Sequence, residues 1–598
     1  MGFWKTVWAA MVGNIIASLI GSIISFVVIL FIIGALFGSE AAEGRRPDAS
    51  IFRLNIGKPV VERGQEIGQL NLSGSDQNIG LNDIQALLNK AKTDESVQVV
   101  LLEVENIQAA PATLLAIHDA IVDFKNSCSK PVIAYAENYS QASYFVASAA
   151  TEVYMYPEGM FDWRGINAEI MFYKRLLDNL EIEAQVIRGP NNKFKSAVEP
   201  YMYDKMSDAN RQQLETFISD IWSTMCQRIS VQRPVFTETL DMAATELRYF
   251  NSSKAVEDGL LNGLIYKDEL ELKLKERLQA NWNEGNSLAD ESISFQDYKA
   301  ELITDQLLNA GNQQVAVVYA VGAIESGKGN DQTIGSERIS KAIREARENP
   351  NVKAVVLRVN SPGGSALASD VIWRETQLLK QSGKPFVVSM GDYAASGGYY
   401  IACGADRIFA LPNTITGSIG VFGVIPNLQK FFENKLGITF DRYETHAHAD
   451  MLGFSKPFDT LEMTAMQNMV SDTYLDFITK VGQGRNMSPA QVDSIGQGRV
   501  WSGQDALAIG LVDELGGLNQ AISYAASKAG IGDSYGRVDY PKMIDPLEEI
   551  LEEISGENTA ARMMESVFGE HAKTFIEIQS FMRGGRIQTR LPFQLEFK

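Results

Sequence analysis

Residues 391–400 read Gly-Asp-Tyr-Ala-Ala-Ser-Gly-Gly-Tyr-Tyr, so Ser396 stands among neighbours that are too small to cover its hydroxyl. The apolar run before this stretch, Lys384–Ser389, has the composition of a buried strand. A serine at a strand-to-helix turn is how hydrolases present a nucleophile. The stretch therefore predicts that Ser396 is the nucleophile of an acyl-transfer reaction.

A second strand and a glycine-rich turn precede this stretch. Ala354–Leu357 is typical of a buried strand, and Ser361–Gly364 reads Ser-Pro-Gly-Gly, which indicates a turn with exposed backbone amides before a helix. Two aimed N–H groups can stabilise the oxyanion of a tetrahedral intermediate. We predict that the amides of Gly364 and Gly397 form this oxyanion hole, with Gly363 as the adjacent alternative to Gly364.

Composition excludes several classes of function. The chain has 598 residues, 45% of them hydrophobic and 21% charged, which is enough for at least two domains. Its net charge of −20 argues against a nucleic-acid partner, because phosphate binding needs clustered lysine and arginine. The three cysteines lie far apart, and none of the four histidines has an obvious catalytic setting. We expect no cofactor, no metal ion and no Ser-His-Asp triad.

The N-terminal region predicts a membrane anchor. Thr6–Ser39 contains no charged residue, and Met11–Phe37 is almost wholly apolar, which exceeds the roughly 20 residues that cross a bilayer. The apolar core of a cleavable signal peptide is only about 7–15 residues long. We therefore predict an uncleaved transmembrane helix. Basic residues flank it on both sides, Lys5 before and Arg45 and Arg46 after, so charge alone does not decide its orientation.

The rest of the chain repeats itself at a spacing of about 255 residues. Strands alternate with helices in each copy, which predicts an α/β fold with mainly parallel sheets covered by helices. We assign residues 1–40 to the anchor, 50–300 to the first repeat, 310–535 to the second and 536–598 to a C-terminal extension. The matching segments are Asp76–Gly80 with Asp331–Gly335, Val99–Val104 with Ala354–Val359, and Ala255–Leu260 with Ala506–Leu511.

The first repeat has lost the nucleophile and the glycine turn. The segment that corresponds to Ser396 is Asn138–Tyr144, which is one residue shorter and places Ala142 or Ser143 at the serine position. The segment that corresponds to the Pro-Gly-Gly turn is Asn106–Ala109, which contains neither proline nor glycine. The first repeat therefore lacks an oxyanion-hole turn.

The second repeat lacks a lysine that the first repeat has. Lys193–Ala197 reads Lys-Phe-Lys-Ser-Ala, whereas the equivalent Thr445–Asp450 contains no lysine. One composite site, with Lys195 as general base and Ser396 as nucleophile, is the economical interpretation. Lys193 is the local alternative base. Holding a lysine neutral at pH 7 costs about 4.6 kcal/mol, so burial must lower the pKa of the base.

Four separate motifs resemble the signal peptide peptidase A family in its long, double-domain form. This family comprises membrane-anchored serine peptidases related to Clp protease and the crotonases. The resemblance implies that each repeat has the Clp protease/crotonase fold, that Lys195 is the base, and that the hydroxyl of Ser418 orients this lysine. The motifs are Asn360–Ser365, Ala395–Tyr400, Thr416–Gly420 and Lys195–Pro200.

The same resemblance implies a location, an assembly and a substrate. We expect a single-pass protein of the bacterial inner membrane, with its catalytic body on the periplasmic side. We also expect a homotetramer that degrades hydrophobic peptides, such as cleaved signal peptides. Two alternatives stay open: a crotonase-like acyl-CoA enzyme, because a Gly-Gly turn also forms an oxyanion hole there, and a catalytically inactive membrane scaffold of the same fold.

Overall fold

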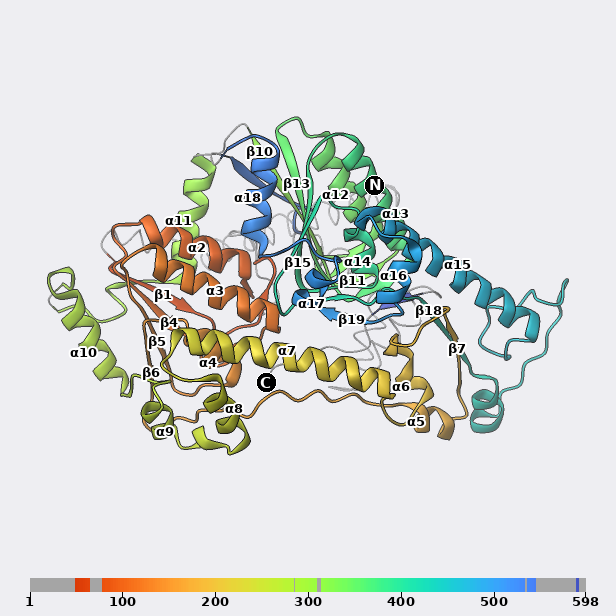
Figure 1. The fold of residues 1–598 in the computed structure, drawn as a ribbon, viewed down its shortest axis with the longest axis horizontal. Helices are drawn as coiled ribbons and strands as arrows, with labels where there is room; N and C mark the ends of the chain where they lie inside the picture. Colours follow the sequence, from red (N-terminus) through yellow and green to blue (C-terminus); the bar gives the residue numbers. More distant parts are fainter. Residues whose placement is uncertain are drawn as a thin grey trace, which may run out of the picture.

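The computed structural model describes residues 49–64, 78–283, 285–308, 313–532, 535–544 and 588–590. Two helix-covered sheets lie side by side along the long axis of the molecule (Figure 1). The predicted transmembrane helix at Thr6–Ser39 lies outside the described residues. Within those residues, every helix is too short or too polar to cross a membrane.

The first repeat is built on a parallel six-stranded sheet of order β8-β6-β5-β4-β1-β9. Alternate residues of its central strands point to opposite faces. Val100 and Leu102 of β4 enter the core under the helices α2 and α3, whereas Val99 and Leu101 pack against α10 on the other face. The bounds are β1 Ile51–Asn55, β4 Val99–Glu103, β5 Val132–Ala136, β6 Glu152–Met155, β8 Gly263–Leu264, β9 Ser292–Ile293, α2 Leu81–Thr93, α3 Pro111–Ser127 and α10 Lys267–Leu278.

The second repeat has the same plan in a sheet of eight strands, in which only the pairing of β17 with β19 is antiparallel. Val355 and Leu357 of β13 face α12 and α13, and Val356 faces α18. The bounds are β10 Gln314–Val321, β13 Val352–Ser361, β15 Phe386–Ala395, β16 Arg407–Ala410, β17 Ile415–Gly417, β19 Val500–Ser502, β20 Glu514–Leu515, β21 Gly536–Tyr540, α12 Ser336–Glu348, α13 Ala366–Gln381 and α18 Leu518–Lys528.

The strand β21 pairs with β10 at the edge of the second sheet, although it comes from the segment that the sequence assigns to the C-terminal extension.

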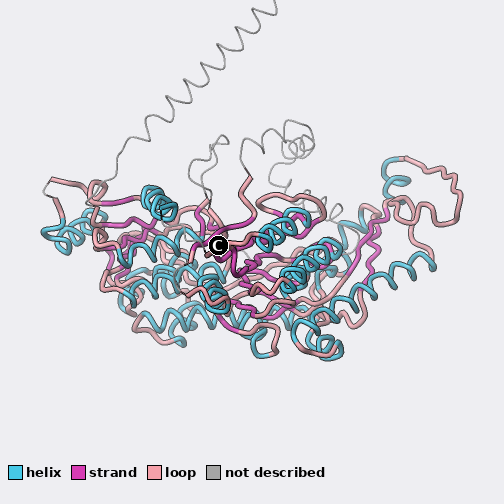
Figure 2. The backbone as a smooth tube through the Cα atoms, turned by 90° about the horizontal axis from the view of Figure 1, so that it is seen from above, coloured by secondary structure: helices cyan, strands magenta, loops and turns pink. Residues whose placement is uncertain are grey.

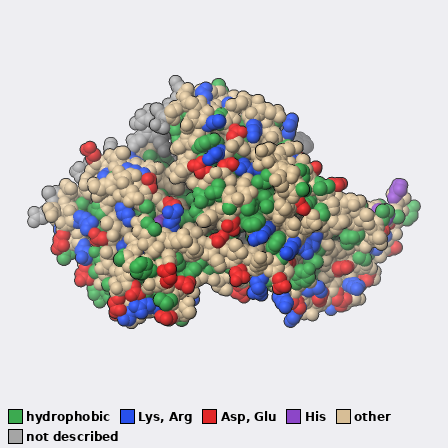
Figure 3. All heavy atoms as spheres, in the orientation of Figure 1, with side chains coloured by type: hydrophobic (Ala, Val, Ile, Leu, Met, Phe, Trp, Pro, Cys, Tyr) green, Lys and Arg blue, Asp and Glu red, His purple; other side chains and the backbone are tan. Residues whose placement is uncertain are grey.

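The molecular surface carries charges of both signs. On the face shown in Figure 3, lysine and arginine side chains are interspersed with aspartate and glutamate.

Two elements of the first repeat reach across to the second. The strand β7 (Glu183–Arg188) pairs antiparallel with β18 (Phe422–Asn427), and these strands belong to a third sheet, which also has six strands. The helix α7 (Asp208–Gln232) begins next to α6 (Glu199–Met202), below β19 of the second repeat. It ends beneath the first sheet (Figure 1). The segment between β7 and α6 contains Lys195 and is thereby held against the second repeat. Figure 2 shows the same two-part body from above, with the loop that precedes α15 (Thr460–Arg485) projecting at one end.

Candidate active site

Ser396 lies in the turn between β15 and the helix α14 (Gly397–Ala402). Its backbone has φ 57° and ψ −113°, a region that non-glycine residues rarely occupy. Its amide donates to the carbonyl of Gly417, at 2.8 Å, which fixes the turn on the neighbouring strand β17. Strain of this kind is typical of serines that are held at the end of a strand for nucleophilic attack.

Lys195 comes from the first repeat and meets Ser396 across 201 residues of chain. Its Nζ lies 2.7 Å from the Oγ of Ser396 and 3.0 Å from both the carbonyl oxygen and the Oγ of Ser418. The amine of Lys195 donates to the Oγ of Ser396 and to both oxygens of Ser418. Loss of one proton would leave this amine with two N–H donors and a lone pair within reach of the Ser396 hydroxyl.

The surroundings of Lys195 favour the neutral form. Both Lys195 and Ser396 are 0% exposed. Burial lowers the pKa of Lys195 well below its ordinary value. The ring centre of Phe422 lies 6.0 Å from Nζ. Lys193, the alternative base, is exposed at the surface.

Ser418 is brought to Ser396 by the pairing of β15 with β17, because Ala395 lies opposite Gly417 and the next residues are the two serines. Ser418 has a positive φ of 50°, and its amide donates to the carbonyl of Arg499 at 2.7 Å. Its side chain is 1% exposed. The structure thus brings together the three side chains that the sequence analysis selected.

The predicted oxyanion-hole turn lies beside the serine. The short strand β14 (Gly363–Ser365) pairs with β11 (Ala323–Glu325), and a Cβ on Gly364 would stand 2.0 Å from the carbonyl oxygen of Ile324. Glycine is therefore required at this position. The amide of Gly363, the adjacent alternative, donates to the Oγ of Ser361 at 3.2 Å.

In the first repeat, the hydroxyl of Ser143 makes hydrogen bonds that differ from those of Ser396. Its Oγ donates to the carbonyl of Glu105 at 2.7 Å and lies 2.8 Å from the Oγ of Ser140. It sits inside the helix α4 (Gln141–Ala147), not at the turn that precedes the helix. The position that corresponds to Ser396 thus has a packing and hydrogen-bonding role in this repeat.

Two residues that the sequence analysis missed support Lys195. The buried side chain of Gln213, on α7, donates from Nε2 to the carbonyl of Phe194 at 3.2 Å and to the Oγ of Ser196 at 3.0 Å. Gly498 has a positive φ of 76°, and a Cβ on it would lie 2.4 Å from the Cβ of Lys195. Both residues thus contact the segment around Lys195. In the sequence, the two closely spaced glycines Gly496 and Gly498 were the signal from which the contact between Gly498 and Lys195 could have been predicted.

We expect Gly498→Ala to lower kcat by about 100-fold, because the added methyl group pushes the lysine away from the serine and a shift of about 1 Å has an effect of that size. Gly530→Ala is the matched control: Gly530 also has a positive φ, of 70°, but a Cβ on it would meet nothing within 4 Å. The measurement is kcat on a peptide substrate together with the thermal midpoint of each variant. Equal loss of kcat in both variants would show that backbone strain, and not the contact with Lys195, is responsible.

A buried polar cluster ties the strand that carries Ser396 to the first repeat. Asp392 of β15 accepts hydrogen bonds from the amide and the Oγ1 of Thr113, at 2.8 and 2.7 Å, at the start of α3. Arg358 of β13 donates to both carboxylate oxygens of Glu62 and to the carbonyl of Met390 in β15. Burial, followed by the charge of Glu62, raises the pKa of Asp392. The cluster, which we call the inter-repeat clamp, fixes the strand four residues before the serine.

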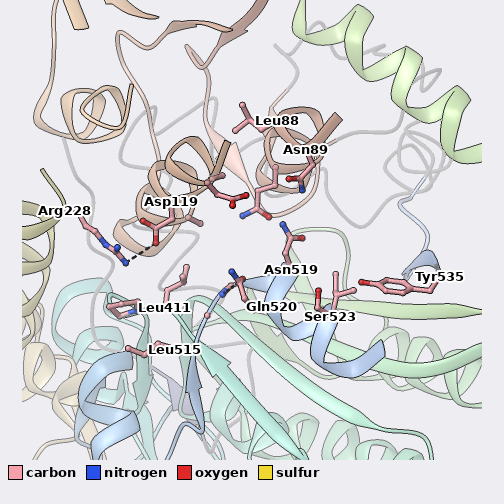
Figure 4. A pocket seen from close by; sticks show the side chains of 18 residues that line it. Leu88, Asn89, Asp119, Arg228, Leu411, Leu515, Asn519, Gln520, Ser523 and Tyr535 are labelled. Atoms are coloured by element: carbon pink, nitrogen blue, oxygen red, sulfur yellow. Dashed lines mark hydrogen bonds and ion pairs between the residues drawn. The ribbon is translucent and has the colours of Figure 1, made fainter. Parts of the chain in front are cut away.

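A cavity of about 600 Å³ lies between the repeats, lined by residues of α2 and α3 on one side and α18 on the other (Figure 4). An ion pair between Asp119 and Arg228, at 3.2 Å, lies on its wall. The lining residues do not include Ser396, Lys195 or Ser418. The cavity is therefore separate from the site that these three residues form.

Among the described residues, one group has side chains close enough to share a metal ion: His448, Asp459 and Glu462. Asp459 and Glu462 form the capping box of α15, and Lys456 lies 3.2 Å from Glu462. Helix capping and an ion pair thus account for this group.

Comparisons with known proteins place the chain among peptidases. The model of peptidase family S49 matches residues 125–281, which contain Lys195, and residues 378–532, which contain Ser396 and Ser418. The chain is 33% identical to "Protease 4" of Salmonella typhi, over 88% of this chain and 86% of that protein. It is 35% identical to "Protease 4" of Haemophilus influenzae, over 77% and 74% of the two chains.

A plant protein is a third relative. "Serine protease SPPA, chloroplastic" of Arabidopsis thaliana is 31% identical over 78% of this chain and 68% of that protein. The family model and the three relatives together identify a serine endopeptidase. The family model also matches twice, once in each of the predicted repeats. The chain therefore belongs to peptidase family S49, with the domain of that family present in duplicate.

Proposed function

We propose that Ser396 and Lys195 form a Ser-Lys dyad with which this endopeptidase cleaves hydrophobic peptides, including signal peptides left in the membrane. The single observation that carries the dyad is the 2.7 Å contact between Nζ and Oγ in a fully buried site. The lysine comes from one repeat and the serine from the other. One chain therefore builds one active site.

In this mechanism Ser396 attacks the carbonyl carbon of the scissile peptide bond, and Lys195 takes the proton of its hydroxyl. Protonated Lys195 then gives that proton to the departing amine, which leaves an acyl ester on Ser396. Neutral Lys195 next activates a water molecule that hydrolyses the ester and restores the serine. The low pKa of Lys195 makes each of these transfers possible near neutral pH.

Two further groups assist. The amides of Gly397 and Gly364 donate to the oxyanion of the tetrahedral intermediate, since Gly397 directly follows the serine and β14 lies against α14. Ser418 holds the amine of Lys195 through two hydrogen bonds of 3.0 Å, which leaves the lone pair directed at Ser396. Ser418 is thus a residue that positions the base.

The apolar segment Thr6–Ser39 supports a membrane-anchored enzyme. An anchor keeps the catalytic body close to peptides that remain in the bilayer. We propose that this catalytic body lies on the periplasmic side of a bacterial inner membrane and that the protein forms homotetramers. Both assignments rest on the resemblance of its motifs to the signal peptide peptidase A family.

The test is hydrolysis of a fluorogenic apolar peptide by the detergent-solubilised full chain. We expect Ser396→Ala to lower kcat by at least about 10⁴-fold, as the loss of a catalytic serine does elsewhere. Ser143→Ala, which removes the serine near the equivalent position of the first repeat, is expected to retain activity. A Ser396→Ala variant that keeps wild-type activity would overturn the assignment. A wild type that neither cleaves peptides nor reacts with serine-directed acylating probes would indicate the inactive scaffold.

A further inference from the structure

A buried glutamate follows Lys195 in the chain and is bound by the start of α7. Glu199 begins α6, and Ser207 is the N-cap residue of α7. One carboxylate oxygen of Glu199 accepts from the Oγ of Ser207 at 2.5 Å. The other accepts from the amide of Ser207 at 3.2 Å and from the Nδ2 of Asn210 at 2.9 Å. Three donors at the start of α7 therefore hold this carboxylate.

The hydrogen bonds continue from Asn210 to the lysine segment. The Nε2 of Gln213 lies 3.0 Å from the Oδ1 of Asn210, and it is also within hydrogen-bond distance of the carbonyl of Phe194 and the Oγ of Ser196. Phe194 and Ser196 are the two neighbours of Lys195 in the chain. All three side chains of this connection are buried. We call them the polar relay: Glu199, Asn210 and Gln213.

The last member of the polar relay also contacts the second repeat. The Oε1 of Gln213 accepts from the amide of Val500 at 3.4 Å. Val500 lies opposite Gly417 in the pairing of β19 with β17, and Ser418 follows Gly417 directly. One side chain thus links the segment that carries the lysine to the strands beside the serine that binds its amine.

The carboxylate of Glu199 is unusual because it is buried without a cation. Among the described residues, its hydrogen-bond partners are Ser207 and Asn210, and no lysine or arginine forms an ion pair with it. Burial of a charge is costly unless hydrogen bonds and local dipoles compensate, and the N-terminus of a helix favours a negative charge. A buried network whose members are all hydrogen-bonded fixes the positions of the groups that it joins.

Resting on the proposed function, we propose that Glu199 and Asn210 are positioning residues for the base of this endopeptidase. Acting through Gln213, they fix the backbone of Lys195 so that its amine reaches the hydroxyl of Ser396. Neither side chain hydrogen-bonds to the dyad itself. Loss of the polar relay therefore displaces the lysine and slows proton transfer, while substrate binding is unchanged.

The test begins with Asn210→Leu, because leucine has a similar shape but neither donates to Glu199 nor accepts from Gln213. We expect kcat per active site to fall by about tenfold with KM unchanged. This is less than the roughly 100-fold loss that a shift of about 1 Å causes, since Gln213 keeps its contacts with the lysine segment. The measurement is hydrolysis of a fluorogenic apolar peptide by the full chain. Active sites are counted by titration with a serine-directed acylating probe.

Asn413→Leu is the matched control. Asn413 is also a buried asparagine, but its side chain has no hydrogen-bond partner among the described residues. We expect its substitution to leave kcat per active site unchanged. An equal loss in Asn413→Leu and Asn210→Leu would show that replacing any buried asparagine slows the enzyme, and would overturn the proposal.

A double variant tests whether the hydrogen bonds themselves position the lysine. In Glu199→Gln, Asn210→Asp the carboxamide at position 199 donates to the carboxylate at position 210, which still accepts from Gln213. Donor and acceptor are exchanged at one contact, and the negative charge stays in the first turn of α7. We expect its kcat per active site to return close to that of the wild type. A double variant as slow as Asn210→Leu would contradict the polar relay.

Two further readings separate positioning from folding and from the dyad. A merely structural role would lower the thermal midpoint and the number of titrated sites but leave kcat per site unchanged, and this result for Asn210→Leu would overturn the proposal. Ser396→Ala is assayed alongside. If it is inactive while Asn210→Leu has the wild-type kcat per site, the positioning role is wrong and the dyad stands. If Ser396→Ala keeps its activity, the dyad is wrong and the positioning role is wrong with it.

Discussion

Lys195→Ala is expected to lower kcat by at least about 10⁴-fold, whereas Lys193→Ala keeps wild-type activity. The reason is that Lys195 is fully buried with its amine 2.7 Å from the nucleophile, while Lys193 is exposed. Lys195→Arg should be equally inactive, because a guanidinium stays protonated and cannot act as a base. The measurement is single-turnover and steady-state hydrolysis of an apolar peptide. Activity that is lost in Lys193→Ala and kept in Lys195→Ala would assign the base to Lys193.

The lowered pKa of Lys195 predicts how kcat/KM and the free energy of unfolding depend on pH. In the proposed mechanism neutral lysine is the active form, so kcat/KM should rise with pH through the lowered pKa of Lys195 and level off above it. Between this pKa and the unfolded value near 10.4, the unfolded chain binds more protons than the folded one, so the free energy of unfolding rises with pH in that range. Lys195→Met removes the free-energy cost of keeping a buried lysine neutral in the folded state. It should therefore be inactive yet at least as stable as the wild type at pH 7, a result that separates loss of the base from loss of the fold.

Arg358→Ala is expected to reduce the free energy of unfolding by about 3–5 kcal/mol, because it leaves the carboxylate of Glu62 buried beside Asp392 without its cation. Arg407→Ala is the matched control. Its ion pair with Glu514 also joins two strands of the second sheet, but both side chains are more than one third exposed, so we expect a loss of about 0–1 kcal/mol. Urea-induced unfolding measures both losses.

The inter-repeat clamp should also affect catalytic activity. Arg358 and Asp392 bind the first repeat from the two long strands that lead to the active-site turn, so Arg358→Ala should also reduce kcat in the fraction that stays folded. Replacing both Arg358 and Glu62 by apolar residues should recover part of the stability, because the carboxylate of Glu62 is then no longer left buried without its cation. A loss in Arg358→Ala no larger than in Arg407→Ala would show that the clamp does not stabilise the fold.

Much of the site was predictable because it depends on local sequence. The small residues around Ser396 and the Pro-Gly-Gly turn require particular backbone conformations, which the positive φ of Ser396 and Gly364 shows. Comparing the two repeats also allowed the lysine to be paired with the serine. The choice between Lys193 and Lys195 was harder, since both fit an extended segment, and only burial against the second repeat distinguishes them.

The residues that support the site could not be found in this way. Gln213 contacts the lysine segment because the start of α7 lies beside the second repeat, and Thr113 meets Asp392 across 279 positions of the chain. Neither contact leaves a periodic or local pattern in the sequence. The pairing of the strand β22 (Gln588–Arg590) with β14 and β18 is a long-range contact of the same kind, since a three-residue polar strand has no distinctive composition.

The distance of 201 residues between Lys195 and Ser396 has a consequence for shortened chains and for the two repeats. In the proposed mechanism, a chain that ends before Ser396 contains the base without the nucleophile, so it should have no proteolytic activity. The same division makes the two repeats depend on each other, because neither repeat alone contains both groups of the proposed dyad.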